Sequence, residues 1–277
     1  MRRRLGWLAL VLLAVAVQQV LWGKLFPFSP VLIGFERVAD RAAGVYLQPR
    51  ALGPADLDVD ALVAEVEQWH GLTLRHAPEI VAFASDASYL RHAPTRARFC
   101  AFPSGRLVVS PWALREAAAG RISLATYLRH ELSHLLLFDY GGLRALWRCP
   151  AWLLEGTAVV SADQMGTAFY PSREQTLALV RAGNWVPPAL FKTKAEAAIT
   201  LHVPYRQPFI YCQNACLVDN LLDRVGRDRF LAYLRAVVTG GQADGAFAAT
   251  FGESFDAYLA GFRARLAQDP AGARRSR

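Results

Sequence analysis

Residues 130–134 read His-Glu-Leu-Ser-His, and the rest of the chain is interpreted outward from this stretch. In an α-helix, residues four apart lie on one face, so His130 and His134 can reach the same metal ion. Glu131 lies beside them, where its carboxylate can take a proton from a metal-activated water. With six His and ten Glu in 277 residues, about 0.005 such matches are expected by chance. The stretch therefore predicts a zinc hydrolase, most directly a peptidase.

The surrounding residues predict that this stretch lies in the middle of a helix. Ser123 is a hydroxyl residue suited to the N-cap, and apolar spacing follows it. Residues 135–138 continue an apolar face, and Gly141-Gly142 ends it. The alternative is a core helix whose two histidines pair with nearby polar groups.

A catalytic zinc usually has three protein ligands and one position for water, so a third ligand is needed. Glu155 is the first candidate, because 20 residues separate it from His134 and Pro150 can begin a second helix. Asp139 is the alternative, but five residues along a helix place it off the ligand face. Asp163 is either a support for a ligand or a solvated helix position, with the second interpretation favoured.

The two motifs together resemble a known group of enzymes. H-E-x-x-H, about 20 residues and then Pro-x-Trp-Leu-x-Glu-Gly-x-Ala (residues 150–158) is similar to the gluzincin zinc metallopeptidases, in particular the peptidase MA-like group. The resemblance covers roughly residues 107–234. It implies that His130, His134 and Glu155 bind Zn²⁺ and that Glu131 is the general base. The position that supports a histidine in thermolysin-like relatives is Val159 here, so that support is absent.

The resemblance also implies a mechanism. Zinc-bound water activated by Glu131 attacks a peptide carbonyl, and Glu131 then passes the proton to the leaving amine. Tyr211 matches the tyrosine that these enzymes often use to stabilise the oxyanion. A core tyrosine is nearly as good an interpretation of Tyr211, and His202 and Tyr205 are the next candidates because they precede the same helix.

The predicted fold class is α+β and zincin-like: a small mixed β-sheet and the active-site helix, followed by a mainly helical C-terminal half. The resemblance implies an edge strand that lines the substrate cleft, and residues 106–110 are the candidate, paired with 99–102 in a hairpin. Residues 31–45 and 58–69 have helical spacing. One catalytic domain is expected over residues 25–269, with the zinc in a cleft between 55–140 and 150–269. Residues 270–277 are expected to be a disordered tail.

Residues 1–24 predict a signal anchor or a signal peptide. Three arginines precede an apolar run from Leu5 to Val17, which resumes after Gln18-Gln19 and ends at Trp22. The anchor, an N-terminal membrane helix of 18 residues from Leu5 to Trp22, is favoured over a cleaved peptide. Either places the catalytic domain outside the cytoplasm, at the periplasmic side of a bacterial inner membrane, or secreted if the segment is cleaved.

Composition narrows the remaining choices. The net charge is +8, but many arginines lie at the two ends of the chain and no aromatic-interleaved basic patch occurs, so a nucleic-acid partner is not expected. The expected partners are a peptide or protein substrate and the membrane, and the sequence leaves the oligomeric state open. The four cysteines permit a Cys212–Cys216 or a Cys100–Cys149 disulfide, or buried thiols.

Two other functions compete with the peptidase. One is an inactive binding or scaffold protein on the same fold, since fold does not fix function. The intact Glu131 favours activity over this alternative, because a structural metal site needs no base. The other is a zinc hydrolase that acts on a non-peptide amide by the same water chemistry.

Overall fold

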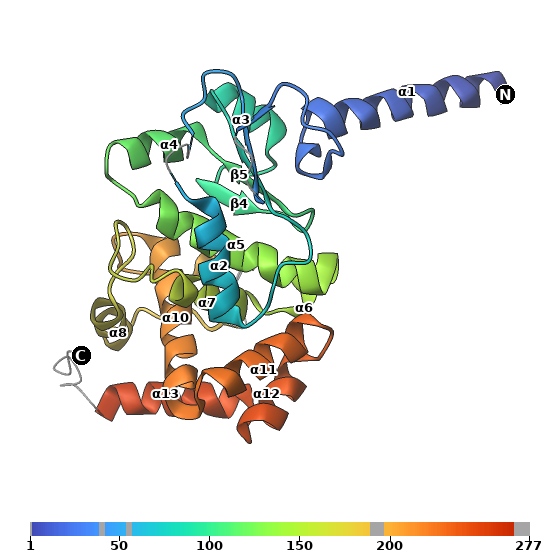
Figure 1. The fold of residues 1–277 in the computed structure, drawn as a ribbon. Helices are drawn as coiled ribbons and strands as arrows, with labels where there is room; N and C mark the ends of the chain where they lie inside the picture. Colours follow the sequence, from blue (N-terminus) through green and yellow to red (C-terminus); the bar gives the residue numbers. More distant parts are fainter. Residues whose placement is uncertain (1, 39–41, 54–56, 189–196, 269–277) are drawn as a thin grey trace. The chain divides into compact units, whose positions relative to one another are not determined.

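The computed structural model describes residues 2–38, 42–53, 57–188 and 197–268, with side chains from residue 6 onward. Contacts group the chain into two compact units (Figure 1). Unit 1 comprises residues 1–65 and 74–135, and unit 2 comprises residues 66–73 and 136–277. The division between the units falls inside one continuous helix, α5 (Leu124–Gly141). The expected tail at 270–277 lies outside the described residues.

Unit 1 is built on a five-stranded mixed sheet with the order β1-β2-β3-β5-β4. The strands are β1 (Glu36–Arg37), β2 (Gly44–Leu47), β3 (Glu79–Ala82), β4 (Phe99–Ala101) and β5 (Arg106–Val109). β2, β3 and β5 are parallel, whereas β1 and β4 run antiparallel at the two edges. Every residue of β5 is buried, which is typical of a strand covered on both faces.

The helices of unit 1 are α1 (Arg2–Trp22), α3 (Asp86–His92), α4 (Pro111–Ala118) and the first turns of α5, with a short 3₁₀ turn η1 (Phe26–Phe28). One face of the sheet packs into an aromatic cluster that includes Phe26, Phe83 and Tyr89. Ser85 and Ser110 accept hydrogen bonds from backbone N–H groups at the starts of α3 and α4. These side-chain caps explain why both helices begin directly after short strands or turns.

The hairpin prediction is confirmed, but the edge-strand prediction is wrong. β4 pairs with β5 around the turn at Gly105, whose φ of +83° suits glycine. Residues 106–110 were expected to form the edge, yet β5 also pairs with β3 and therefore lies inside the sheet. The edge on this side of the sheet is β4, because within the described ranges it pairs with β5 alone.

Unit 2 is helical. Its helices are α6 (Ala145–Arg148), α7 (Ala151–Ser161), α8 (Arg173–Arg181), α10 (Arg206–Val225), α11 (Arg227–Val238), α12 (Ala243–Phe251) and α13 (Phe255–Gln268), with a 3₁₀ turn η2 (Gly142–Arg144). The helix α2 (Val59–His70), expected at 58–69, spans the sequence boundary of the units.

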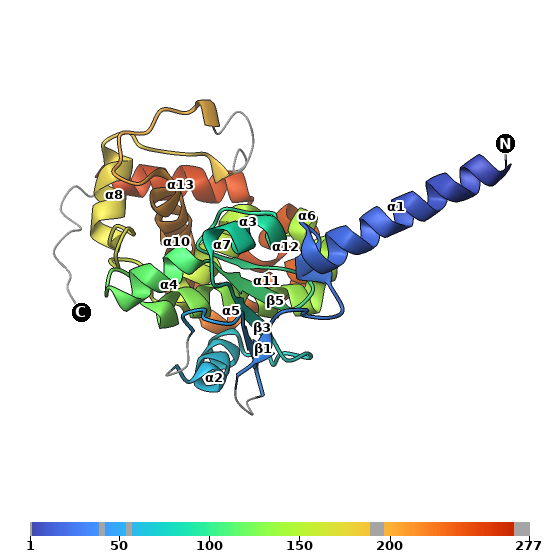
Figure 2. The same ribbon diagram turned by 90° about the horizontal axis from the view of Figure 1, so that it is seen from above.

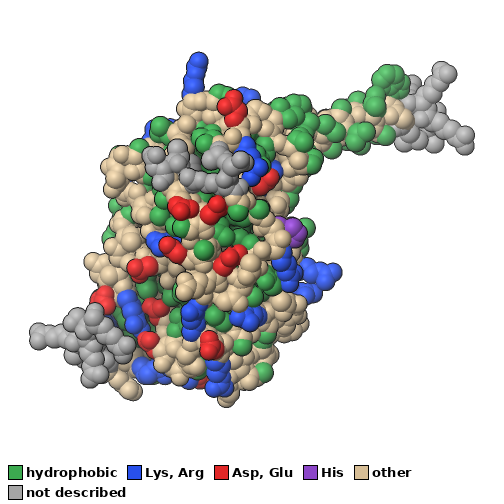
Figure 3. Space-filling view, viewed as in Figure 1, with side chains coloured by type: hydrophobic (Ala, Val, Ile, Leu, Met, Phe, Trp, Pro, Cys, Tyr) green, Lys and Arg blue, Asp and Glu red, His purple; other side chains and the backbone are tan. Residues whose placement is uncertain are grey.

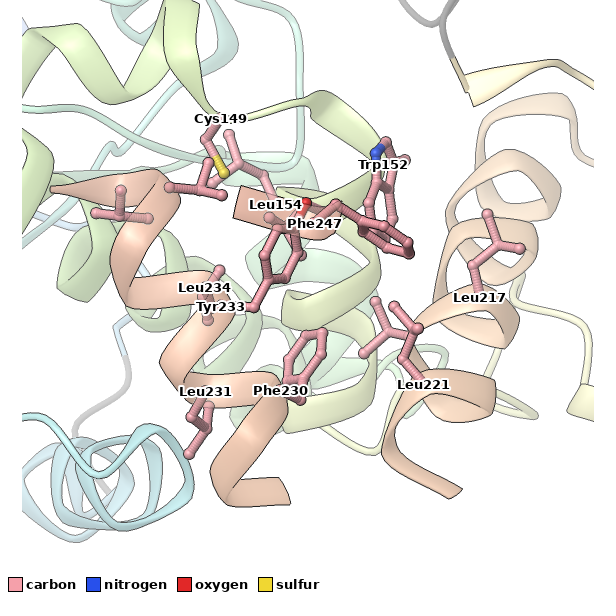
Figure 4. Packing of buried hydrophobic residues seen from close by; sticks show 14 of the residues in the cluster. Cys149, Trp152, Leu154, Leu217, Leu221, Phe230, Leu231, Tyr233, Leu234 and Phe247 are labelled. Atoms are coloured by element: carbon pink, nitrogen blue, oxygen red, sulfur yellow. The ribbon is translucent and has the colours of Figure 1, made fainter. Parts of the chain in front are cut away.

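The core of unit 2 gathers apolar side chains from several of these helices. Figure 4 shows Phe230 of α11 beside Leu221 of α10, and Tyr233 of α11 directed toward Phe247 of α12, with Trp152 of α7 nearby. All five are at most 2 % exposed. Burial of this many large side chains, each contributing about 1.5–3 kcal/mol, fixes α7 and α10 in one framework. α7 carries Glu155, so this core also fixes the position of that carboxylate.

The predicted N-terminal membrane helix is corrected by the structure. Residues 2–22 do form a helix, α1, and its apolar side chains are exposed along its length (Figure 3). However, no helix among the described residues is both long and apolar enough to cross a bilayer. The uninterrupted apolar run of α1 ends at Gln18, and 13 residues from Leu5 to Val17 span about 20 Å, less than the roughly 30 Å of a hydrocarbon core.

The prediction of a helix at residues 31–45 is also wrong. Its described residues include β1 and the beginning of β2 instead. Gly34 has φ of +83°, which interrupts a helix, and Gly44–Leu47 pairs in parallel with β3. Pairing with a strand distant in sequence overrides local apolar spacing here.

Candidate metal centre

The motif helix α5 begins at the cap that the sequence predicted. Ser123 Oγ accepts a hydrogen bond of 3.2 Å from the backbone N–H of Thr126. The helix then runs from Leu124 to Gly141, so His130 and His134 lie in its middle turns. Both neighbouring leucines, Leu132 and Leu135, are buried. The apolar face anchors α5 and holds the two imidazoles in a shielded position.

His130 and His134 direct the same ring atom toward one point. Their Nε2 atoms are 3.2 Å apart, and the rings are nearly perpendicular with centroids 4.9 Å apart. Two nitrogens bound to one tetrahedral zinc at 2.0–2.1 Å are about 3.3 Å apart, so this spacing fits a shared Zn²⁺. Both side chains are buried, with 4 % and 8 % of their surface exposed.

Glu155 reaches the same point from the next helix. α7 begins at Ala151, directly after Pro150, as the sequence predicted, and Glu155 is 5 % exposed in its second turn. One ligand atom from each of His130, His134 and Glu155 lies within 4.8 Å of the others. Two imidazoles and a carboxylate are a donor set that suits zinc and leaves one coordination position for water.

The other acidic candidates are outside this cluster. Asp139 lies near the end of α5 and is not among the clustered donors. Asp163 follows the end of α7, is exposed, and has φ of +50°. The solvated interpretation of Asp163 therefore fits its position.

Glu131 has a defined partner in the edge strand. Its Oε2 accepts a hydrogen bond of 2.8 Å from the backbone N–H of Ala101 in β4. One turn earlier on α5, Tyr127 stacks on Phe99 of β4 with ring centroids 5.0 Å apart. Residues one turn apart on α5 thus contact residues two apart on β4, which aligns the helix along the strand.

The hydrogen-bond pattern of the hairpin explains why this N–H group is available. Phe102 N–H donates to Arg106 O, and Ser110 N–H donates to Arg98 O. Positions alternate along an antiparallel pair, so Ala101, opposite Leu107, directs its N–H away from β5. Sequence reasoning missed Ala101 because a backbone donor at a strand edge carries no side-chain signature.

Tyr211 lies in α10, the helix that packs most extensively against α7. It is partly buried and packs on a cluster of Val186, Phe209 and Ile210. The adjacent Gln213 is buried and exchanges hydrogen bonds of 3.0 and 2.7 Å with the backbone N–H and C=O of Val186. α10 is thereby fixed to the segment before residue 189.

The two alternatives to Tyr211 are more exposed. Tyr205 is 51 % exposed at the N-cap of α10, and His202 is exposed in the preceding loop.

The histidines expected to be structural or surface residues are His70 and His92, which are buried, and His76, which is exposed. Burial lowers the pKa of His92, whose Nδ1 lies 2.8 Å from Ser88 O.

The four cysteines are thiols, so neither suggested disulfide is formed. Burial raises the pKa of Cys212 to about 12, and burial also raises the pKa of Cys149 and of Cys216 well above the ordinary thiol value. These thiols remain protonated at neutral pH, which suits inert core residues rather than nucleophiles or metal ligands.

Comparison with known proteins identifies no relative of the chain. No family model, no curated protein and no solved structure matches it. The side chains of the site are therefore the basis on which a function is proposed.

Proposed function

We propose that this protein is a zinc-dependent peptide hydrolase of gluzincin type. The observation that carries the proposal is the convergence of His130, His134 and Glu155 within 4.8 Å in buried positions. Three donors of this kind leave a position for water, as catalytic zinc sites require. Glu131 adjoins the cluster in sequence and is only partly buried, so its carboxylate is accessible for proton transfer.

Each residue has a distinct role in the proposed reaction. Zinc held by the three side chains would polarise the scissile carbonyl and lower the pKa of water. Glu131 accepts the proton of the attacking water and delivers it to the leaving amine. The Ala101 N–H group orients one carboxylate oxygen of Glu131 and leaves the other for the water. Tyr211 donates its hydroxyl proton to the oxyanion in a hydrogen bond.

Edge strand β4 supports a polypeptide as the substrate. It aligns with α5 through Phe99 and Ala101, and among the residues that the structure describes no further strand pairs with its outer edge. An extended peptide can pair with such an edge through main-chain hydrogen bonds at positions other than the Ala101 N–H group, which donates to Glu131. We therefore place the substrate backbone along β4, beside Glu131.

The test combines metal analysis with turnover. Wild type is expected to bind one zinc ion, and His130→Ala to lose it. Glu131→Gln should retain zinc while turnover of a peptide substrate falls by about 10²–10⁴-fold, because the base is lost. His76→Ala, which changes an exposed histidine outside the cluster, is the control and should match wild type.

Three outcomes would contradict the proposal. Unchanged zinc content in His130→Ala would show that His130 does not bind the metal. Unchanged turnover in Glu131→Gln would show that Glu131 is not the general base. Absent turnover in zinc-loaded wild type would favour the scaffold alternative. Parallel assays with peptides and cell-wall amides separate a peptidase from a hydrolase of non-peptide amides.

A further inference from the structure

Unit 2 contains an apolar cavity of about 490 Å³ that the proposed chemistry does not use. Its walls come from residues 168–171, from one face of α8, and from the first turn of α10 with the two residues before it. Figure 2 shows α8 beside α10. The rings of Phe169 and Tyr205 form part of the wall and meet edge-to-face with centroids 5.1 Å apart.

The chemistry of the lining selects an uncharged ligand. Among the described lining residues, none is Asp, Glu, Lys, Arg or His. The side chain of Gln175 already accepts a hydrogen bond from Ser172 N–H as part of the N-terminal cap of α8. A charged group would lose its hydration here without gaining an ionic partner, whereas an apolar group would gain burial. A volume in the range of 300–1,000 Å³ is typical of ligand sites.

The cavity is continuous with the framework that carries the third metal ligand. Phe209 lines it and also belongs to the buried cluster of Val186, Phe209 and Ile210, against which Leu179, Tyr211 and Ala151 pack. Ala151 lies on α7 one helical turn before Glu155, so both side chains project from the same side of that helix. The cavity wall and the carboxylate are therefore connected through the first two turns of α7.

The backbone at the rim of the cavity is strained. Ala168 lines the cavity with φ of +42°, a left-handed conformation that is rare for residues other than glycine. Such a conformation is energetically unfavourable for a residue with a Cβ atom and is found preferentially at ligand-binding loops. The strained backbone of Ala168 and the apolar lining are two separate observations, and both point to the cavity as a ligand site.

We propose that this cavity binds an aromatic or large aliphatic side chain of the polypeptide that is cleaved at the His130, His134 and Glu155 centre. The assignment rests on the proposed function and adds substrate selectivity to it. The protein prefers substrates with Phe or Leu at the position that enters the cavity and discriminates against Asp.

The first experiment measures binding without catalysis. Wild-type protein is treated with a chelator and titrated with fluorescein-labelled peptides of sequence Gly-Ser-Gly-X-Gly-Ser-Gly, where X is Phe, Leu, Ala or Asp. Fluorescence polarisation is expected to show about tenfold or greater tightening for Phe and Leu over Asp, since burial of a large apolar side chain is favourable. Equal affinity for all four peptides would overturn the proposal.

Variants locate the preference. Ala178 lines the cavity and is exposed, so Ala178→Trp fills the space without overpacking a core and should abolish the preference for Phe. The matched control is Ala182→Trp, at the exposed C-terminal end of the same helix and outside the cavity lining. Tyr205→Ala removes an exposed wall and should weaken the preference by about tenfold. Circular dichroism checks that all three fold.

The second experiment measures cleavage of the same peptides by zinc-loaded protein. The ratio of kcat/KM for Phe over Asp should exceed about tenfold in wild type and Ala182→Trp, and approach one in Ala178→Trp. A ratio unchanged in Ala178→Trp would overturn the proposal. Selective binding to the metal-free protein without any cleavage of the zinc-loaded protein would contradict the proposed function instead and leave the side-chain preference standing.

Discussion

The hydrogen bond between the Ala101 N–H group and the Glu131 carboxylate is a single contact whose effect on the site can be tested. The carboxylate is held by a backbone N–H group that the β4–β5 ladder does not use. A side chain free to rotate spends less time in the orientation that takes a proton from water. In the proposed reaction, the strand would therefore contribute to proton transfer by orienting Glu131.

Ala101→Pro removes this donor without breaking the ladder, because the residue occupies a position that does not bond to β5. Proline is tolerated on edge strands in such positions. We expect kcat to fall about tenfold, which corresponds to the loss of one hydrogen bond to a charged group, while zinc content stays constant. Ala101→Val retains the N–H group and suits a strand, so it should match wild type. An equal fall in both variants would show that the N–H group is not responsible.

Asp219 permits a second prediction at this scale. Burial raises the pKa of its carboxyl to about 6 from an ordinary 3.8; the attraction of Arg173 opposes the rise, and the neighbouring carboxylates Asp223 and Asp163 add to it. Because the folded state holds the proton more tightly, the free energy of unfolding decreases as pH rises from about 4 to 6. Asp219→Asn should remove this decrease and raise the free energy of unfolding at pH 7 by about 1–3 kcal/mol.

Chemical denaturation at pH 4, 5, 6 and 7 measures this effect. Asp223→Asn is the matched control, because its carboxylate also pairs with Arg173, at 3.0 Å, but is 66 % exposed. Its effect on the free energy of unfolding should stay within about 0.5 kcal/mol. A pH dependence retained in Asp219→Asn would refute the assignment.

The sequence predicted the convergence of His130, His134 and Glu155 because helical spacing and the proline before α7 are local signals. It could not predict Ala101, since the position of a backbone donor depends on which strand forms the edge. It also could not predict Asp219, whose burial depends on how α10 packs. The roles of Glu131 and Tyr211 in catalysis stay predictions.

At the scale of elements, the close approach of α7 and α10 determines where Glu155 lies. Gly156 adjoins this ligand, and a Cβ atom added there would lie 2.6 Å from the backbone oxygen of Asn214. Only glycine permits this separation of the two helices. The local pattern predicted both helices, but no feature of the sequence marked Gly156 as the point of contact.

Gly156→Ala should consequently lower the free energy of unfolding by about 2 kcal/mol, although alanine favours helices by about 1 kcal/mol. Displacement of α7 should also weaken zinc binding by about tenfold or more. Gly261→Ala in α13 is the control, because the nearest atom to its added Cβ is in the flexible side chain of Arg265, at 3.3 Å. That variant should be unchanged or stabilised by up to about 1 kcal/mol. Stabilisation of Gly156→Ala would show that the helices can separate freely.

The sheet shows where element prediction from sequence succeeds and fails. The β4–β5 hairpin was predicted because a turn joins adjacent segments. Two predictions failed for the same reason. β5 was expected to be the edge strand, but it lies inside the sheet because it pairs in parallel with β3. Residues 31–45 were expected to form a helix, but strands form there because β2 also pairs in parallel with β3. Parallel pairs join segments distant in sequence, so local periodicity carries little information about them.

At the scale of the whole molecule, the surface can be described by where its charged and its apolar side chains lie. On the face shown in Figure 3, Lys and Arg side chains are interspersed with Asp and Glu, and apolar side chains follow α1. The net charge of +8 thus does not collect into one basic surface on that face. The expected location outside the cytoplasm stays a prediction.

Zinc binding should stabilise the folded protein as a whole, because the three ligands come from two helices separated in sequence and the unfolded chain does not hold them together. At zinc concentrations about 100-fold above Kd, the free energy of unfolding should rise by about 2.7 kcal/mol. For a chain of this size, Tm should then rise by about 5–10 °C. Differential scanning calorimetry of chelated protein, with and without added zinc, measures this shift.

The variants separate metal binding from catalysis in the same measurement. Glu131→Gln and His202→Ala should show the wild-type shift in Tm, since neither residue belongs to the donor cluster. His130→Ala and Glu155→Ala should show none. A full shift in Glu155→Ala would mean that zinc is held without the carboxylate of α7, and the arrangement of two histidines and one glutamate would then have to be abandoned. A shift that depends on all three donors and not on Glu131 would assign the metal to this cluster independently of any substrate.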